Sequence, residues 1–582
     1  MKESRLTLTS VFSKKKIVYL FLLFFAFNNC ILSEGHQPVR GKHGMVVSAS
    51  KLASDVGVQI LKKGGNAVDA AVAVGFALAV TYPYAGNIGG GGFMVIHLKN
   101  GTNTTIDFRE KAPASAHRNM YQDENGNFVP ELSQEGATSA GVPGSVAGMI
   151  YALKKYGNLS LSDVISPAIE LAEDGWIVDH KTAELFYHYF NDFKKYPSTL
   201  KVFSNNGKPF TDGQIFKQTQ LAETLEMIKD EGTNGFYKGK IADLIVKQIK
   251  SMGGYITLED LANYKVAERK PVEGTYRGYE VVSMAPPSSG GIALIELLNI
   301  LENYCFNSAD FGSSEYIHKL VEAMKFVYAD RTYNLGDSDF YPVPVDKLIS
   351  KKYAASNFDK IKSDNNKAVP SDNIKPWKPG TGKESTETTH YSVYDKYGNA
   401  VSTTTTINSG FGSKIVVEGA GFLLNNEMDD FSSKPGVPNQ YGLLGSEANS
   451  IQPEKRMLSS MTPTIILKKN KPFIIIGSPG GSTIITTVLQ VIMNCIDFGM
   501  NISQAIDAPR IHHQWYPDEI YSEKFSLNKD TAEKLMKMGY SLANFNKKPK
   551  VLGIAEGIMI DQQNGVIYGA SDPRGSGSAE GY

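Results

Sequence analysis

A nearly unbroken apolar stretch at residues 66–81 is the feature that most limits how this chain can fold. A helix that is apolar all round is stable only where other layers cover it on most sides. A helical pattern at residues 49–63 precedes it, and Gly64-Gly65 separates the two. The sequence therefore predicts two consecutive helices, the second of them buried in a large interior.

Length and composition can supply such an interior. The chain has 582 residues, of which 42% are hydrophobic and 21% charged, and these values are typical of globular proteins. The length corresponds to roughly three or four domains of ordinary size, and one large α/β unit with many layers is the alternative. Disorder of the whole chain is excluded.

The first 35 residues have the character of a secretory signal peptide. Three lysines at positions 14–16 precede the apolar run 17–27, which is too short to span a bilayer. We therefore predict a signal peptide at residues 1–35 and export to the periplasm or the extracellular space. Two alternatives stay open: a buried core segment, and a lipid anchor at Cys30 that would attach the protein to a membrane.

The remainder of the chain carries 55 basic and 58 acidic residues, a net charge of −3. A near-neutral surface has no general attraction for phosphate backbones, so we expect a small substrate and no nucleic-acid partner. The cysteine spacing suggests no zinc site, and we expect Cys305 and Cys495 to be buried thiols rather than a disulfide.

The first half of the chain also shows helical and strand patterns. Residues 160–330 alternate amphipathic segments, such as 163–172 and 216–230, with polar turns, which favours a single helical layer. Four glycines at positions 89–92 precede the strand-like run 93–98. No Lys-Ser/Thr pair follows these glycines, so close backbone packing is a better interpretation than a phosphate loop.

The composition changes abruptly before residue 388. Residues 363–387 are almost entirely polar, Gly or Pro, and such a segment is expected to be exposed and mobile. Directly after it, the strand-like runs 389–394 and 400–407 flank turn residues at 395–399, which predicts a β-hairpin. A polar linker therefore leads straight into a strand at Thr388.

This junction suggests a specific chemistry. A threonine hydroxyl is a poor nucleophile unless a base removes its proton, and a free α-amine on the same residue can serve as that base. Cleavage between Glu387 and Thr388 would create this amine, and the Thr388 hydroxyl could itself attack the Glu387 carbonyl. An ordinary Thr-rich edge strand is the alternative that the residues alone leave open.

The run Thr388-Thr389-His390-Tyr391-Ser392-Val393 resembles the processing site of the γ-glutamyltranspeptidases, which are N-terminal nucleophile hydrolases. The similarity continues on both sides of it and covers nearly the whole mature chain. The matching segments are residues 64–71, 87–92, 107–110, 286–291, 424–431, 455–463, 477–482 and 579–582.

The resemblance implies a role for several residues around the nucleophile. Thr406 would assist Thr388, and Gly480 and Gly481 would form the oxyanion hole, in keeping with their position between an apolar run and a probable helix start. A surface position for Thr406 and a plain strand-to-helix turn for the glycines are the alternatives.

The resemblance also implies a site for the amino-acid head group of the substrate. Arg109 would bind its α-carboxylate, because a guanidinium forms paired, charge-assisted hydrogen bonds. A structural ion pair is the alternative for Arg109. Glu427 and Asp430 lie three positions apart. Such a pair of acids could also belong to a glycosidase or to a calcium site, but the sequence shows no further catalytic residues or ligands for either. The other implied residues are Ser459 and Ser460 for the carboxylate, Asn408, Glu427 and Asp430 for the ammonium, and Tyr441 in a lid loop at 434–450.

As a whole, the resemblance implies an α/β (α+β) four-layer αββα sandwich made from a self-cleaved precursor. A large subunit, residues 36–387, and a small subunit, residues 388–582, would be interwoven in one catalytic domain. The implied activity is cleavage of glutathione and related γ-glutamyl compounds, without a metal or organic cofactor, and transfer to water, amino acids or dipeptides. The alternatives are a β-lactam side-chain acylase of the same superfamily and an inactive binding protein.

Overall fold

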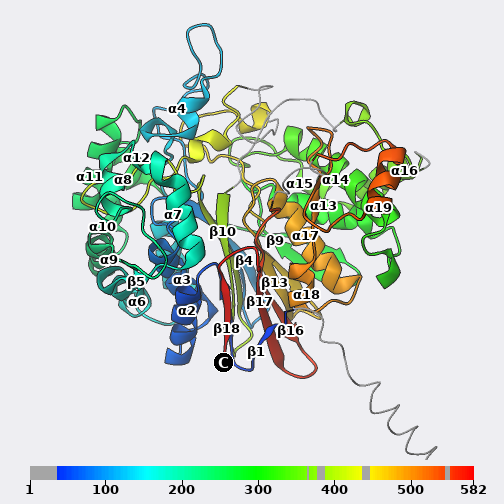
Figure 1. The fold of residues 1–582 in the computed structure, drawn as a ribbon, viewed down its shortest axis with the longest axis horizontal. Coiled ribbons are helices and arrows are strands. Elements are labelled where there is room, and N and C mark those ends of the chain that lie inside the picture. The colour runs from blue at the N-terminus through cyan, green and yellow to red at the C-terminus, as the bar shows by residue number, and fades with distance from the viewer. Residues whose placement is uncertain (1–35, 364–365, 376–386, 435–445, 544–550) are drawn as a thin grey trace, which may run out of the picture. The chain divides into compact units, whose positions relative to one another are not determined.

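Two seven-stranded antiparallel sheets form the centre of the protein in a computed structural model (Figure 1). The structure describes residues 36–363, 366–375, 387–434, 446–543 and 551–582, with the side chain of Glu387 excepted. The predicted signal peptide with Cys30, and Tyr441 with most of its loop, lie outside these residues. The chain divides into residues 1–37 and one compact unit, residues 38–582.

The first sheet contains the predicted hairpin and is called the nucleophile sheet below. Its strands lie in the order β18 (Ser578–Gly581), β2 (Met45–Ser48), β10 (Glu387–Tyr394), β11 (Ala400–Asn408), β3 (Gly91–His97), β4 (Asn103–Asp107) and β7 (Ala267–Arg269). The second sheet has the order β1 (Val39–Gly41), β17 (Val566–Ser571), β16 (Glu556–Asp561), β13 (Pro472–Gly477), β12 (Thr464–Leu467), β9 (Tyr279–Ser283) and β8 (Val272–Tyr276).

The two sheets pack face to face through alternate side chains of their strands. Phe93 and Val95 of β3 belong to the core between the sheets, together with Ile475 of β13. Met94 of β3 and Ile474 of β13 belong instead to the cores on the outer faces. Because successive side chains of a strand point to opposite faces, both sheets are buried on both sides.

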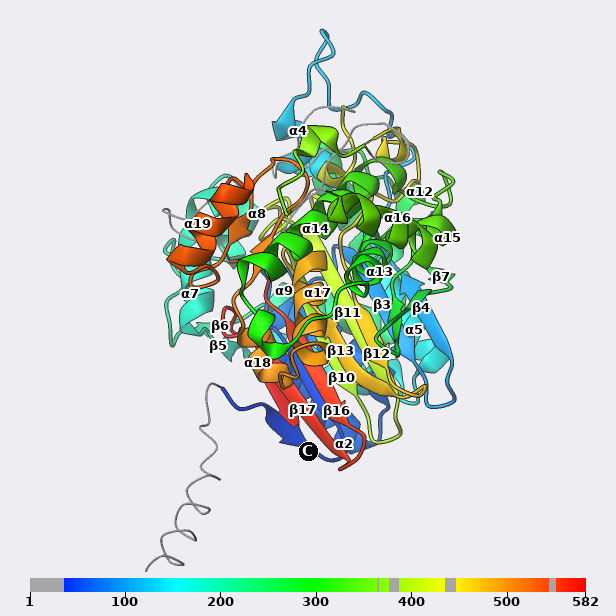
Figure 2. The ribbon, with the colours of Figure 1, turned by 90° about the vertical axis from the view of Figure 1, so that its right-hand side faces the viewer.

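Helices cover the two outer faces. The nucleophile sheet packs against α2 (Lys51–Lys63), α3 (Ala67–Thr81) and α5 (Ser145–Tyr156), and the second sheet against α13 (Gly290–Leu301), α14 (Ser314–Asn334) and α17 (Thr483–Ile496). Figure 2 shows α13, α14 and α17 in front of the strands of the second sheet. The layers are therefore helix, sheet, sheet, helix, and the predicted αββα sandwich is confirmed.

The apolar stretch that was predicted as a buried helix is α3. Every one of its 15 residues is buried. The Asn66 side chain accepts hydrogen bonds from Val68 N and Asp69 N, and the Asp69 side chain accepts one from Asn66 N, so the helix starts with a capping box. Gly64 ends α2 in the left-handed region at a φ of 106°, which explains the break between the two helices.

The prediction of one helical layer at residues 160–330 is wrong. α6 (Leu161–Asp174) and α9 (Thr219–Glu231) pack with α3 on the nucleophile sheet, whereas α13 and α14 cover the second sheet. Between these groups lie β7, β8 and β9, which have only three to five residues each. Strands this short leave a weak periodicity in the sequence, so the crossing from one layer to the other was missed.

The expectation for the cysteines was right for one of them only. Both are free thiols, but Cys495 is buried in α17 and Cys305 is exposed. Within the described part of the chain, no helix is both long and apolar enough to span a bilayer.

Candidate active site

Thr388 lies at an irregularity in the predicted hairpin. Glu387 pairs with Asn408, but Thr389 pairs with Thr405, so Thr406 and Ile407 of β11 together face the single residue Thr388. A bulge of this kind bends the strand and changes the direction of a side chain. Thr388 is 5% exposed. It therefore lies inside the molecule at the start of β10, in the middle of the nucleophile sheet.

The predicted site residues meet around one small cavity, called the polar cavity below. Its volume is about 10 Å³, which is room for about one water molecule. Of the predicted residues, those that line it are Arg109, Thr388, Thr406, Asn408, Glu427, Asp430, Ser459, Ser460 and Gly481. Strands β10 and β11 of the nucleophile sheet, the 3₁₀ turn Glu427–Asp430, the loop before β12 and the start of α17 therefore meet at the nucleophile.

Arg109 is the cation of the polar cavity and is fully buried. Its Nη1 donates to Glu427 and its Nη2 donates to Asp430. The resemblance implies that Arg109 and these two acids bind opposite ends of a substrate, but in the structure they contact each other. Buried charges of opposite sign stabilise one another in this way, because each would otherwise lie unpaired in a dry site.

Glu110 is a part of the site to which the sequence analysis gave no role. It is fully buried, and its Oε2 lies 3.5 Å from Arg109 Nη1. Its two oxygens and Oε2 of Glu427 have no hydrogen-bond donor among the described residues. Burial raises the pKa of Glu110 to about 7 and raises the pKa of Glu427 well above its usual range.

Desolvation is the main cause of both pKa shifts, and the positive charge of Arg109 opposes it. If all three acids around Arg109 were ionised, one guanidinium would have to balance three carboxylates in a dry cavity. A neutral Glu110 or Glu427 would carry an O–H group, which is the kind of donor that the orphan oxygens of this group lack. The only sequence signal for Glu110 was its place beside Arg109 in the matching segment 107–110.

The end of β11 carries the two other predicted residues of this strand. Thr406 Oγ1 accepts a hydrogen bond of 2.7 Å from Asn408 N, which holds the Thr406 side chain on the cavity side. The Asn408 Nδ2 donates to Asn426 O at 2.8 Å. One N–H of the Asn408 side-chain amide is thus in use, and its Oδ1 is the atom that can accept from a ligand.

Gly480 and Gly481 form the predicted turn between β13 and α17. Their φ values are 132° and 56°, a region that glycine adopts without steric cost. Their carbonyls accept from Thr483 N and Ile484 N, both at 3.1 Å, in the first turn of the helix. Their own amides donate to no other residue of the described chain, so two N–H groups beside Thr388 are available for an oxyanion.

Ser459 and Ser460 also line the polar cavity and lie in the loop that leads to β12. Ser459 Oγ accepts from Met461 N at 3.1 Å, and Ser460 Oγ accepts from Arg331 Nη2 at 3.1 Å. Arg331 is buried in α14, and desolvation lowers its pKa to about 10. Arg331 is not among the predicted site residues, since a single arginine in a helix carries no local signal in the sequence.

Known proteins resemble this chain over most of its length. The profile of the family described as Gamma-glutamyltranspeptidase matches residues 53–582. The chain is 51% identical over 538 residues to the glutathione hydrolase proenzyme of Escherichia coli (strain K12), with 92% of this chain and 91% of that protein covered.

Solved structures show the same likeness. The crystal structure of Helicobacter pylori gamma-glutamyltranspeptidase is 50% identical, with a TM-score of 0.56 over 59% of this chain and 96% of that chain. A cephalosporin acylase from Bacillus halodurans is 29% identical, with a TM-score of 0.84 over 95% of this chain and 98% of that chain.

Proposed function

The chain belongs to the γ-glutamyltranspeptidase family, and from this premise we propose that it is a glutathione hydrolase and γ-glutamyltransferase that cuts itself before Thr388. The observation that carries this proposal is the polar cavity, where a nucleophile, two free amides and side chains of both charges lie together. A γ-glutamyl group needs this combination, because it has an α-carboxylate and an α-ammonium beside the acyl group that reacts.

Self-cleavage would produce the active nucleophile. The Thr388 hydroxyl attacks the Glu387 carbonyl, the peptide bond becomes an ester, and water hydrolyses the ester to give a Glu387 carboxylate and a free Thr388 amine. The products would be a large subunit, residues 36–387, and a small subunit, residues 388–582. Removal of residues 1–35 as a signal peptide would accompany export.

In the mature enzyme, the Thr388 amine takes the proton of the Thr388 hydroxyl as the oxygen attacks the γ-carbonyl of the donor. The negative charge that develops on the carbonyl oxygen is stabilised by the N–H groups of Gly480 and Gly481, each of the order of a few kcal/mol. Thr406 assists the nucleophile from the neighbouring strand. The amine half of the donor leaves with the proton, and water or an amino acid then takes the γ-glutamyl group from Thr388.

The ion pairs of Arg109 indicate how the head group is recognised. A bound donor would separate these charges. Its α-carboxylate would take the place of the two acids at Arg109 and would also contact Ser459 and Ser460. Its α-ammonium takes Glu427, Asp430 and the Oδ1 of Asn408. Because the cavity has room for about one water molecule, only a ligand that supplies both charges can open it without leaving a buried charge unpaired.

These charges also favour a γ-glutamyl donor over the two alternative functions. The acyl group of a β-lactam side chain need not carry an α-ammonium and an α-carboxylate, so the complete set of Arg109, Glu427 and Asp430 favours a γ-glutamyl donor. An inactive binding protein would not require free amides at Gly480 and Gly481 beside Thr388.

The proposal can be tested with the exported protein and its Thr388→Ala variant. We expect the wild type to yield two fragments on denaturing electrophoresis, the smaller one beginning at Thr388, and to consume glutathione. Thr388→Ala should remain one band and be inactive, because it lacks the attacking oxygen. Efficient cleavage of the variant at the same bond would show that another protease makes the cut, and a small fragment with a different first residue would refute Thr388 as the nucleophile.

A further inference from the structure

Thr388 borders a second cavity that is far larger than the polar cavity and is called the outer cleft below. Its volume is about 930 Å³, which is at the upper end of the range for pockets that bind small molecules. It is lined by residues of α7 (His180–Phe193), by Phe210 and by the segments 551–554 and 574–576. Thr388 lines both cavities, with Gly481 on the polar side and Gly480 on the side of the outer cleft.

This junction constrains how an amide can lie in the site. If the γ-carbonyl carbon is at Thr388 and its oxygen at the two glycine amides, the two halves of the donor must leave in different directions. The polar cavity is matched to the amino-acid head group, so the amine half extends into the outer cleft. The same cleft is then open to an acceptor once the first product has left.

Lys181 on α7 is a cation in the wall of the outer cleft. It donates to the backbone carbonyls of Gly575 and Pro573, the latter at 3.1 Å, and it forms no ion pair with a carboxylate of the described residues. An ammonium group has three donors, so one remains. Glu184, one turn further along α7, has His180 Nε2 at 3.5 Å, and Arg574 is already paired with Glu523 and Asp572.

The rest of the wall is rich in apolar and aromatic surface. Tyr187 is 76% exposed and Val551 is 54% exposed, and Tyr82, Tyr84 and Phe210 line the same cleft. An aromatic leaving group without charge would bind to this surface alone. A peptide leaving group with a free C-terminus would bring a carboxylate that needs a cation.

We propose that Lys181, in the wall of the outer cleft, favours donors whose leaving group carries a free carboxylate and acceptors that carry one. This inference rests on the proposed function, because it assumes a γ-glutamyl donor attacked by Thr388. It assigns to Lys181 a role in specificity and none in the attack itself.

The test compares two donors that differ in the charge of the leaving group. Glutathione releases a peptide with a carboxylate, and γ-glutamyl-p-nitroanilide releases a neutral aromatic amine. Lys181→Met should lower kcat/KM for glutathione by about three- to five-fold, the effect expected for a partly exposed ion pair, and leave kcat/KM for the anilide unchanged within two-fold. Lys181→Arg keeps the charge and should retain most of the glutathione activity.

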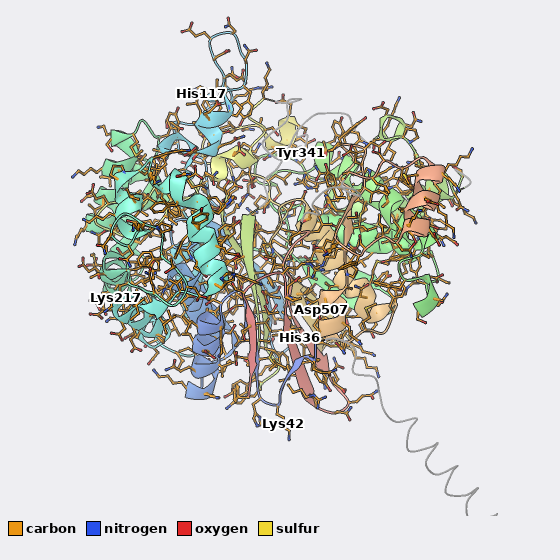
Figure 3. All side chains as sticks on the ribbon, in the orientation of Figure 1. His36, Lys42, His117, Lys217, Tyr341 and Asp507 are labelled. Atoms are coloured by element: carbon orange, nitrogen blue, oxygen red, sulfur yellow. The ribbon has the colours of Figure 1, made fainter. Side chains whose placement is uncertain are left out.

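Acceptors provide a second comparison with a matched control. Lys181→Met should raise KM for glycylglycine but not for glycylglycine amide. Lys217→Met removes an exposed lysine that does not line the cleft (Figure 3) and should change none of these values.

Two results would overturn the inference while the proposed function stands: an unchanged kcat/KM for glutathione in Lys181→Met, or an equal loss with both donors. A wild-type protein that turns over neither donor would overturn the proposed function, and the inference with it.

Discussion

At the scale of single residues, the polar cavity is lined by buried side chains of opposite charge that pair with one another. Arg109 pairs with Glu427 and Asp430, and Glu110 lies behind them with both oxygens unsatisfied by any described donor. Leaving one charge without its partner in such a site costs several kcal/mol. Separating these pairs is therefore unfavourable unless a ligand supplies a charge of each sign.

Glu110 should make the stability of the protein depend on pH. Burial raises its pKa from 4.5 to about 7, so between these values the folded state binds a proton that the unfolded state has lost. The free energy of unfolding then falls as pH rises through this window, at most by about 1.4 kcal/mol per pH unit, and this contribution is constant above pH 7.

The Glu110→Gln variant isolates this contribution, since glutamine does not titrate. Thermal unfolding from pH 4.5 to 7 should show a steeper fall of Tm in the wild type than in Glu110→Gln. Glu124→Gln, which changes an exposed residue, should behave as the wild type does. Parallel Tm curves for Glu110→Gln and the wild type would mean that Glu110 is ionised in the folded protein.

At the scale of secondary-structure elements, a glycine allows the two sheets to approach each other next to the nucleophile. The His390 ring of β10 faces Gly477 of β13, and a Cβ at Gly477 would lie 2.3 Å from His390 Nδ1. Nδ1 of the ring bonds with Thr404 Oγ1 at 2.9 Å and Nε2 with Ser392 Oγ at 3.1 Å. Burial lowers the pKa of His390 to about 3, so the ring is neutral at neutral pH.

Gly477→Ala should therefore lower the free energy of unfolding by about 1–3 kcal/mol, because the extra methyl group overpacks the space between the sheets. The same substitution should cost much less in a His390→Ala background, where the ring is absent. Urea denaturation of the two single variants and the double variant measures this coupling. An equal cost in both backgrounds would show that the ring does not limit the approach of β13 to β10.

At the scale of the whole molecule, the proposed cut does not separate two domains. In the nucleophile sheet β2, which precedes residue 388, lies between β18 and β10, and in the second sheet β1, β8 and β9 flank four strands that follow it. Each sheet would therefore contain strands of both subunits, and the core between the sheets contains side chains from both sides of the cut.

We expect the two subunits to stay together after the cut and to unfold together. Size-exclusion chromatography of the cleaved protein should give one peak that contains both fragments, and urea should separate them only in the range where tertiary structure is lost. Elution of two separate folded fragments under native conditions would contradict this expectation.

Local sequence patterns were enough to predict α2, α3, the hairpin of β10 and β11, and the position of Thr388 at its start, because these features depend on neighbours in the chain. The resemblance added the residues of the polar cavity, and the αββα layers that it implied are confirmed. Only the tertiary structure could decide the rest. It shows that β7, β8 and β9 carry the chain from one outer layer towards the other, and that Arg109 pairs with Glu427 and Asp430. It also shows that Arg331 and Lys181 lie beside the site. The physical reason is that a charge buried by distant segments takes its partners and its pKa from those segments, and residues hundreds of positions apart leave no periodic signal in the sequence.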